Sequence, residues 1–385
     1  MKIGIDIRTL MDKHYSGVSE YTYNLIREIF RHDKKNDYKL FYNSGRDIGK
    51  AIPEFNYPNV EVINLRYPNK IFNYIMQKSL HYPKIDRLLG VDLFFMPHIN
   101  FISLSAYCQK LITVHDLSFL RYKEFFSFRK NIWHKFVNVK SLLNKFDAII
   151  AISENTKRDI IELAGVDESK IKVIYSGISG EFKPLDQADK KLKRVKKKYN
   201  LPDKFILYLG TVEPRKNVSG IIKAFSRIKD SLQNEGEYGQ IKLIIAGARG
   251  WKSKNIFKDA GDSKYKEDII FLGYVSRDDK IGLYNLAALF IYVSFYEGFG
   301  FPPLEAMACG CPTIAGGASS LYEIAQNGAL TVNPHNITEI TSAALELLKN
   351  KKLKNLLISR GAAVSHKFNW ENSAGKYLDI FNGNI

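Results

Sequence analysis

Two glutamates, Glu297 and Glu305, stand on either side of a glycine-containing loop, Gly298-Phe-Gly300. Because glycine has no Cβ, a ligand can lie directly against the backbone of such a loop. A helix is expected to begin after the loop, and its unpaired N–H groups favour an anion. Carboxylates, in contrast, accept hydrogen bonds from hydroxyl groups. The stretch therefore predicts a ligand that is a polyol and also carries phosphate.

The elements that must position this loop are a strand before it and a short helix after it. Residues 288–293 form an apolar run that predicts a buried strand. Pro303 is tolerated at the start of a helix, whereas Gly310 and Pro312 predict its end. Similar apolar runs recur along the chain at the spacing of βα units, so we expect an α/β fold.

The run from Glu297 to Gly310, Glu-Gly-Phe-Gly-Phe-Pro-Pro-Leu-Glu-Ala-Met-Ala-Cys-Gly, resembles the signature of the family 4 retaining glycosyltransferases of GT-B fold. An isolated pair of glutamates at this spacing would instead be assigned to the surface. The resemblance implies that Glu297 binds the donor sugar and that Glu305 binds the ribose of the nucleotide. It also implies donor contacts from the residues of the intervening loop and helix start, which are Gly298, Phe299, Gly300, Phe301 and Leu304.

A second loop, Gly210-Thr-Val-Glu-Pro-Arg-Lys-Asn217, resembles the phosphate clamp of the same family. Taken alone, an Arg-Lys pair would be assigned to the surface. The resemblance implies that Arg215 and Lys216 stabilise the leaving diphosphate, which fixed cations do without reorganisation. It also implies a donor contact at Gly210. We expect Asn217 to cap the helix that follows. A separate run, Phe271-Leu-Gly-Tyr-Val275, resembles the family strand whose backbone receives the nucleotide base, which implies a donor contact at Val275.

Two residues of the first half also gain a role from the resemblance, although a lone glycine or histidine at a strand end is more often structural. Gly17 lies in a Ser-Gly-Val-Ser step, which in the family approaches the donor diphosphate. His115 follows an apolar run in a Val-His-Asp step, where family members place a histidine against the donor sugar. We expect His115 to donate a hydrogen bond in the transition state or to orient the sugar, and Asp116 to hold the loop or the histidine tautomer.

The composition of the chain limits the classes of protein to which it can belong. The chain has 385 residues, 45% of them hydrophobic and 25% charged, which is ordinary for a soluble protein of two domains. A net charge of +17 favours anionic partners. The three cysteines lack a Cys-x-x-Cys pattern, so neither a disulfide framework nor a zinc site is expected. No apolar run reaches the length of a membrane span, and the chain opens directly into a predicted strand. We expect a cytoplasmic protein.

Residues 125–146 carry Phe and aliphatic residues at helical spacing, with cations off that stripe. Two interpretations stay open: a core helix with a solvated basic face, or a helix that also contacts anionic membrane through Phe126 and Trp133. Residues 66–87 add basic and aromatic side chains in the same half. A peripheral location on the inner face of the cytoplasmic membrane, with an acceptor on a lipid carrier, fits the second interpretation.

The boundary between domains is expected where the composition becomes strongly basic, over residues 190–198. No aromatic platform or base-reading motif accompanies these lysines, so we expect a charged linker and a solvated helix, and not nucleic-acid binding. The predicted organisation is an N-terminal Rossmann-like domain over 1–180 on the acceptor side, a basic linker over 181–202 and a C-terminal Rossmann-like domain over 203–368 on the donor side. In the GT-B fold the two domains face a central cleft, and the tail, 369–385, crosses back to the first domain as a helix.

The predicted reaction moves a hexose from a nucleoside diphosphate sugar to a saccharide or lipid-linked acceptor with retention of anomeric configuration. GDP-mannose is the favoured donor, because the chain looks most like mannosyltransferases of surface polysaccharide assembly; UDP-glucose, UDP-galactose and N-acetylhexosamine donors stay open. No cofactor is expected. No Asp-x-Asp run lies near the motif, so we expect no metal requirement. The rival interpretations are a nucleotide-sugar epimerase of the same architecture, a glycosidase that uses the two glutamates, and a basic protein that binds nucleic acid or membrane.

Overall fold

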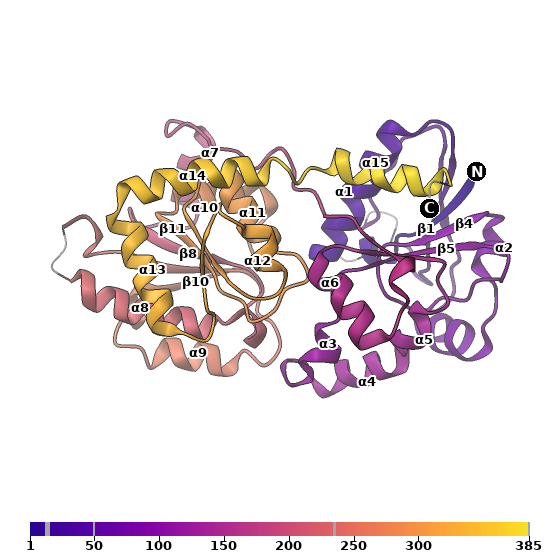
Figure 1. The fold of residues 1–385 in the computed structure, drawn as a ribbon, viewed down its shortest axis with the longest axis horizontal. Helices are drawn as coiled ribbons and strands as arrows, with labels where there is room; N and C mark the ends of the chain where they lie inside the picture. Colours follow the sequence, from indigo (N-terminus) through magenta and orange to yellow (C-terminus); the bar gives the residue numbers. More distant parts are fainter. Residues whose placement is uncertain (12–15, 49–50, 234–235, 384–385) are drawn as a thin grey trace. The chain divides into compact units, whose positions relative to one another are not determined.

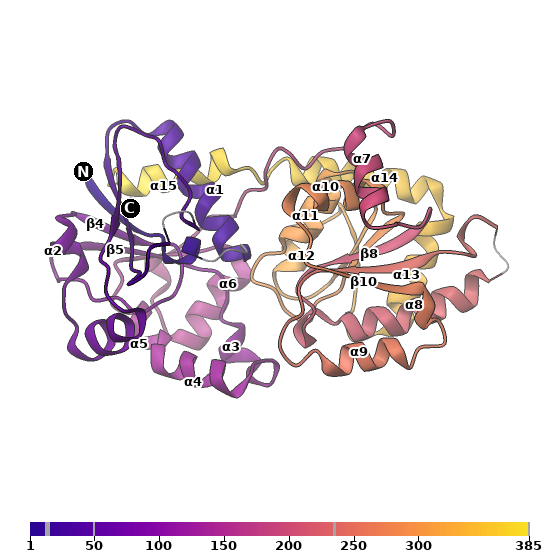
Figure 2. The same cartoon turned by 180° about the vertical axis from the view of Figure 1, so that it is seen from behind.

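The computed structural model of the chain describes residues 1–11, 16–48, 51–233 and 236–383. They divide into two compact units. The first unit contains residues 1–121, 129–177 and 369–385, and the second contains residues 122–128 and 178–368. The cartoon is drawn from two sides in Figures 1 and 2.

The first unit is built on a parallel sheet that, in the part of the chain described, has seven strands in the order β3-β2-β1-β4-β5-β6-β7. The strands are β1 Lys2–Asp6, β2 Asp37–Tyr42, β3 Val60–Asn64, β4 Leu93–Met96, β5 Gln109–Val114, β6 Ala148–Ala151 and β7 Ile171–Val173. The α-helices are α1 Gly17–His32, α2 Ile85–Leu89, α3 Ser118–Arg121, α4 Phe128–Val137, α5 Val139–Leu143, α6 Glu154–Asp159 and α15 Trp370–Phe381. Two π-helices, η3 Ile71–Leu80 and η5 Ile160–Ala164, complete the main elements.

The second unit repeats the pattern with a six-stranded parallel sheet, counted over the described residues, in the order β10-β9-β8-β11-β12-β13. The strands are β8 Phe205–Leu209, β9 Lys242–Ala246, β10 Ile269–Gly273, β11 Leu289–Tyr292, β12 Thr313–Gly316 and β13 Leu330–Val332. The α-helices are α7 Lys190–Lys198, α8 Val218–Leu232, α9 Lys254–Gly261, α10 Arg277–Leu286, α11 Phe301–Ala308, α12 Ser320–Ala325, α13 Ile337–Lys349 and α14 Lys351–Ser365. In both views the strands lie between α8 and α9 on one side and α10 and α11 on the other (Figures 1 and 2).

Both sheets have a point where the strand order reverses. Successive strands are added outward from β1 to β3, and the chain then returns to place β4 on the other side of β1; β8 and β11 have the same relation. In open parallel sheets, ligands bind outside the carboxyl ends of the strands at such a switch point. The predicted α/β fold with two Rossmann-like sheets is confirmed.

The C-terminal helix α15 belongs to the first unit, as the sequence predicted, and packs along α1. Three buried hydroxyl groups join it to the sheet: Tyr377 Oη lies 2.6 Å from both Tyr21 Oη and Thr113 Oγ1. Trp370 and Phe381 are buried on the same helix. The last helix of the chain is therefore part of the core of the unit that the chain began.

The single helix predicted over residues 125–146 is wrong. Asn138, at φ 50°, separates α4 from α5, because its left-handed backbone cannot continue a helix, and its side chain caps α5 instead. The apolar stripe divides at the same point. Val139 and Leu143 are buried, but Ile132 and Phe136 on α4 are 39% and 57% exposed.

The basic segment expected as a linker forms α7 and lies within the second unit. Leu192 and Val195 are buried on one face. Its cations face acids of α10: Lys191 Nζ lies 2.6 Å from Asp278, and Lys198 Nζ lies 2.5 Å from Asp279. Part of the strong basic charge is therefore used inside the unit.

No helix among the described residues is long and apolar enough to span a bilayer. Cys108, Cys309 and Cys311 are buried free thiols.

Candidate functional site

The site of the second unit begins where β8 ends. The chain continues through Gly210 into a single 3₁₀ turn, Pro214–Lys216, and then into α8. Asn217 occupies the N-cap position of α8 at φ 56°, but its side chain does not cap the helix as predicted. Its Nδ2 instead donates to the carbonyls of Val293 at 3.1 Å and Pro334 at 2.6 Å. Asn217 thereby ties the end of β8 to the end of β11.

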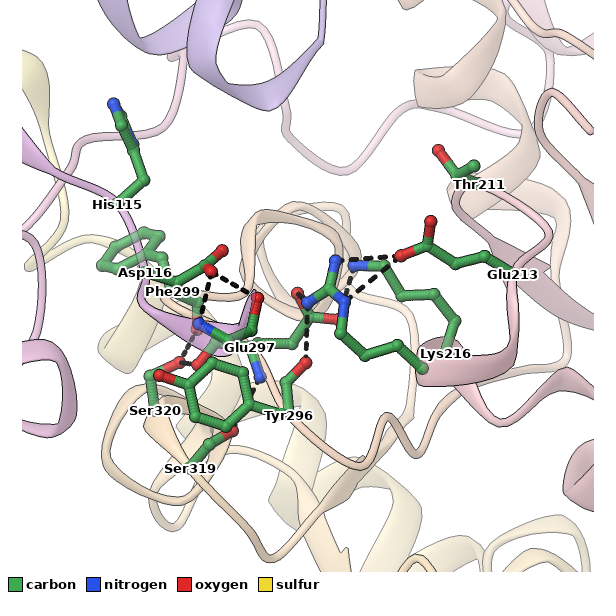
Figure 3. A network of polar contacts seen from close by, with 12 residues as sticks. His115, Asp116, Thr211, Glu213, Lys216, Tyr296, Glu297, Phe299, Ser319 and Ser320 are labelled. Atoms are coloured by element: carbon green, nitrogen blue, oxygen red, sulfur yellow. Dashed lines mark hydrogen bonds and ion pairs between the residues drawn. The ribbon is translucent and has the colours of Figure 1, made fainter. Parts of the chain in front are cut away.

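Lys216 and Glu297 meet at this switch point, one after β8 and the other after β11. Lys216 Nζ donates to Glu297 Oε1 at 2.5 Å (Figure 3). It also donates to Tyr292 Oη at 2.8 Å, and Tyr292 Oη donates to the same Oε1 at 3.0 Å. Lys216 and Glu297 are 11% and 9% exposed at their side chains. The third N–H of the Lys216 ammonium has no partner within the described residues, so it can turn to an anionic ligand.

The charge state of Glu297 follows from its surroundings. Burial alone raises the pKa of Glu297, but the positive charges of Lys216 and Arg215 outweigh that effect and hold this pKa at about 2. Burial, together with Arg215, lowers the pKa of Lys216 despite the neighbouring carboxylate. Glu297 is therefore ionised throughout the physiological range and can accept hydrogen bonds from hydroxyl groups.

Arg215 turns its guanidinium to the protein. Its Nε and one terminal nitrogen donate to Glu213 Oε1 at 3.2 and 3.0 Å, and the other terminal nitrogen donates to Tyr296 O at 2.8 Å and Glu297 Oε2 at 3.2 Å. This geometry makes Arg215 a brace between the two loops, and its predicted contact with the leaving diphosphate stays a prediction. Glu213, only 2% exposed at its side chain, was missed from the sequence. Its place two residues before Arg215 in the same motif was the available signal.

Glycines line the carboxyl edge beside this cluster. Gly210, Gly247 and Gly273 end the neighbouring strands β8, β9 and β10, and Gly247 has φ 141°. A Cβ on Gly247 would lie 1.9 Å from Gly210 O. Gly210 N–H donates to Ala246 O, so its amide serves the sheet. Gly247 and Gly273 were not predicted; glycine directly after a predicted strand was the signal.

The loop between Glu297 and Glu305 is held mainly by residues 319–321. Gly300, at φ 122°, precedes α11, and its missing Cβ avoids a contact of 2.6 Å with Leu321. Glu297 N–H donates to Ser319 Oγ at 2.9 Å, while Ser320 Oγ donates to the carbonyls of Glu297 and Phe299 (Figure 3).

The remaining predicted donor contacts of this unit are largely buried. Phe299 packs against Phe301 at 5.0 Å, and Leu304 and Val275 are also buried. Glu305 Oε2 accepts a hydrogen bond from Tyr284 at 2.9 Å and is 3% exposed. The buried side chains of Phe299 and Leu304 position the backbone of the loop. The structure brings Arg215, Lys216, Glu297 and their glycine neighbours together at one edge of one sheet.

Two predicted residues, Gly17 and His115, belong to the first unit. Gly17 is the first residue of α1, whose N-cap is Ser16, and part of the loop before it (residues 12–15) lies outside the described residues. His115 Nε2 lies 2.8 Å from Pro97 O, so this nitrogen carries the proton and donates. The ring stands edge-on to Tyr21 at 4.6 Å. Gly17 and His115 therefore lie near the same edge of the first sheet.

The histidine geometry sets its chemistry. Burial lowers the pKa of His115, in spite of the hydrogen bond to Pro97 and the charge of Asp116. In the neutral ring Nδ1 is an acceptor only. His115 is thus suited to accept a hydrogen bond from a hydroxyl group at Nδ1, and not to donate one there. Asp116 holds the loop by accepting from Ser118 N at 2.9 Å, whereas Pro97 O fixes the tautomer.

A second polar cluster lies at the switch point of the first sheet and was not predicted. Arg8 donates through Nε and a terminal nitrogen to the buried Asp6, and also to Phe101 O and Asn73 Oδ1. His98, after β4, lies 4.0 Å from Asp6. Burial lowers the pKa of His98 to about 4 despite Asp6, and its buried Nδ1 has no partner among the described residues. No motif marked these residues; only the positions of Asp6 and His98 at predicted strand ends did.

Among the residues described, no three His, Cys, Asp or Glu side chains are grouped so that they could hold a metal ion. The second unit offers an ionised carboxylate for hydroxyl groups, a lysine with an N–H to spare and a backbone edge that a flat ligand can approach. This combination suits a ligand with sugar hydroxyls and a phosphate.

Two family models match the chain. Glycosyltransferase Family 4 matches residues 15–182, and Glycosyl transferases group 1 matches residues 189–364. Each model covers most of one unit, and the second includes both loops of the site.

Curated proteins and solved structures agree with these matches. Serotype-specific mannosyltransferase WbdA of Escherichia coli is 33% identical over 269 residues, or 69% of this chain but only 32% of WbdA, so the chain spans about a third of that protein. O-antigen chain mannosyltransferase B of Escherichia coli is 28% identical over 75% of this chain and 72% of its own length. Sucrose-phosphate synthase of Thermosynechococcus elongatus has the same fold, with a TM-score of 0.76 at 18% identity over 99% of this chain and 98% of that one.

Proposed function

Because this chain belongs to the glycosyltransferases that join a Family 4 domain to a group 1 domain, we propose that it is a retaining hexosyltransferase acting on a nucleoside diphosphate sugar. The GT-B fold and the family predicted from the run around Glu297 are both confirmed. The remaining steps, from donor to acceptor, are proposals.

The observation that carries the proposal is the contact between Lys216 and Glu297 at the switch point of the second sheet. The two loops provide opposite charges within one hydrogen bond, so one ligand can be held by its hydroxyls and by its phosphate together. At the end of β10, nothing lies within 4 Å of the place that a Cβ on Gly273 would take, so the backbone there is open to a nucleotide.

The proposed roles follow from the geometry. Lys216 stabilises charge that develops on the leaving diphosphate, and Glu297 orients the sugar through its hydroxyls. Arg215, braced by Glu213, fixes both loops. Glu305 holds the ribose, and His115 accepts a hydrogen bond from the sugar at Nδ1. The leaving phosphate takes the acceptor proton on the same face of the sugar, so the configuration is retained without a protein nucleophile. We propose that Lys216 and the α8 N-terminus make a divalent metal dispensable.

GDP-mannose is the proposed donor, and mannose is the sugar transferred. The proposed acceptor is the growing saccharide of a surface polysaccharide, carried on a lipid. Support comes from the two relatives reported above, a serotype-specific mannosyltransferase and an O-antigen chain mannosyltransferase. The protein would then work in the cytoplasm, at the inner face of the membrane. UDP-sugars are the alternative donors.

Thermal shift with GDP, UDP, ADP and their sugars, each with EDTA, tests the donor site. A ligand that binds only the folded protein raises the melting temperature by mass action. We expect GDP and GDP-mannose to raise the melting temperature of the wild type but not that of Lys216→Ala. The matched control is Lys352→Ala, which removes an exposed lysine on α14 of the same unit. If no nucleotide shifts the melting temperature of folded protein, the donor site is refuted.

Incubation of GDP-mannose with a lipid-linked saccharide then tests the reaction. Proton NMR of the product reads the anomeric configuration, and we expect it to match that of the donor. Isomerised nucleotide sugar without any acceptor would establish an epimerase instead. Cleavage of a glycoside that lacks phosphate, unaffected by Lys216→Ala, would establish a glycosidase.

A further inference from the structure

Two helices of the first unit expose apolar side chains that a core would bury. On the π-helix η3, Ile71, Tyr74 and Ile75 are 46%, 45% and 52% exposed. On α4, Ile132 and Phe136 are 39% and 57% exposed and lie one turn apart on one face. Single exposed hydrophobic residues need no explanation, but two helices that both expose several do.

The two helices pack against one buried side chain, that of Phe101. Phe101 lies between them, with its ring centroid 5.4 Å from that of Tyr74 on η3 and 6.1 Å from that of Trp133 on α4. Lys78 Nζ lies 5.9 Å from the same ring. We call the exposed residues of η3 and α4, joined through Phe101, the η3–α4 surface.

The two stretches of sequence that contain η3 and α4 are basic. No Asp or Glu occurs in residues 62–85 or in residues 125–146. The cations in these two stretches are Arg66, Lys70, Lys78, Lys84, Arg129, Lys130, Lys135, Lys140 and Lys145. In α7, by comparison, the lysines have acidic partners on α10. The basic composition of the two stretches favours an anionic partner.

We propose that the η3–α4 surface binds the face of an anionic phospholipid bilayer. Exposed Ile and Phe side chains can enter the boundary between headgroups and acyl chains, while the lysines beside them attract acidic headgroups. Nucleic acid fits less well, because Ile71, Ile75 and Ile132 are aliphatic and cannot stack on bases. This proposal deepens the proposed function, since it brings the first unit to the membrane where a lipid-linked acceptor lies. It stands on separate residues from the donor site.

Cosedimentation of the full chain with vesicles tests the proposal. We expect binding to vesicles of phosphatidylcholine mixed with phosphatidylglycerol, weakening as salt is raised, and little binding to phosphatidylcholine alone. Lys70→Gln with Lys135→Gln should weaken binding about fivefold for each cation removed. Ile75→Ser with Phe136→Ser should weaken it about tenfold or more.

The matched control is Lys352→Gln with Leu356→Ser on α14 of the second unit, where an exposed lysine and an exposed leucine also lie one turn apart. It should bind vesicles as the wild type does. All the substituted residues are exposed, so each variant should keep the wild-type melting temperature and its shift with GDP.

Three results would overturn the proposal: equal binding to both kinds of vesicle, no binding to either, or wild-type binding by both surface variants. Self-association of the wild type that the same substitutions abolish, without vesicle binding, would assign the surface to a second copy of the chain. If the protein binds vesicles but no nucleotide, the proposed function is refuted and this inference stands. If it binds nucleotide but no vesicles, this inference is refuted and the proposed function stands.

Discussion

Glu297 is a carboxylate held between two cations, and its ionisation is linked to stability. Its pKa is about 2 in the folded chain against an ordinary value of 4.5, so the unfolded chain binds the proton more tightly. A carboxyl group with a lowered pKa stabilises the fold above its unfolded pKa, and this contribution is lost as pH falls toward the folded pKa. The shift corresponds to about 3 kcal/mol.

We therefore predict that Glu297→Gln lowers the melting temperature at pH 7 and that the difference from wild type narrows between about pH 4.5 and pH 2. The variant should also turn over about 100-fold more slowly, because the sugar loses a charged acceptor. Thermal unfolding across this pH range, with the exposed Glu346→Gln as control, measures the first effect. Parallel stability curves for Glu297→Gln and wild type would contradict it.

Glu213 is the second residue on which the site depends, because it receives two donors of Arg215 through one oxygen. In Glu213→Gln the acceptor oxygen remains but the charge is lost, so Arg215 is held less firmly against Tyr296 and Glu297. We predict a fall in kcat of up to about 100-fold from the misplaced loops. KM for the donor should stay within about twofold, since the proposed donor contacts come from other side chains. A large rise in KM with unchanged kcat would instead make Arg215 a direct ligand of the donor.

At this scale the sequence predicted the residues better than their roles. Lys216 and Glu297 were found from their motifs, and the structure brings them into contact. The motif does not state which way a guanidinium points, so Arg215 was expected to face the phosphate. Arg8 and His98 were missed because their environment depends on three strands that are distant in sequence.

At the scale of elements, the carboxyl edge of the second sheet depends on glycine. Gly247 has φ 141°, and a Cβ there would overlap Gly210 O at 1.9 Å. We predict that Gly247→Ala destabilises the second unit by about 1–3 kcal/mol and moves the β8 end, so that nucleotide binding weakens as well. Gly261→Ala, where a Cβ would meet nothing within 4 Å, should leave both properties near wild type. Denaturant unfolding and thermal shift with GDP measure the two effects, and wild-type nucleotide binding by Gly247→Ala would refute the role of this edge.

The helices show where periodicity stops being informative. Residues 125–146 have an apolar stripe at helical spacing, yet the structure divides them at Asn138 and exposes the first half of the stripe. Periodicity reports which side chains share a face, but not what covers that face. The parallel strands were predicted well because a buried strand is a continuous apolar run whose neighbours follow from the order of βα units.

At the scale of the whole molecule, the chain leaves its first unit at Gly177 and returns to it at Asn369. Hydrogen bonds among the buried hydroxyl groups of Tyr377, Tyr21 and Thr113 hold the returning helix, α15, to the first unit. Tyr21 is also the residue that stands edge-on to His115. The last helix of the chain therefore supports the position of a residue proposed to contact the sugar.

This arrangement predicts coupling between the two ends of the chain. Tyr21→Phe and Tyr377→Phe each remove one hydroxyl from the buried group of three, so each loses the Tyr21–Tyr377 hydrogen bond and one to Thr113, and we expect each to cost about 1–3 kcal/mol. The double variant removes both groups at once, so its loss should be smaller than the sum by about 0.5–3 kcal/mol. Denaturant unfolding of the four proteins measures this difference. Additive losses would mean that the 2.6 Å contact between Tyr21 and Tyr377 does not couple the two ends of the chain.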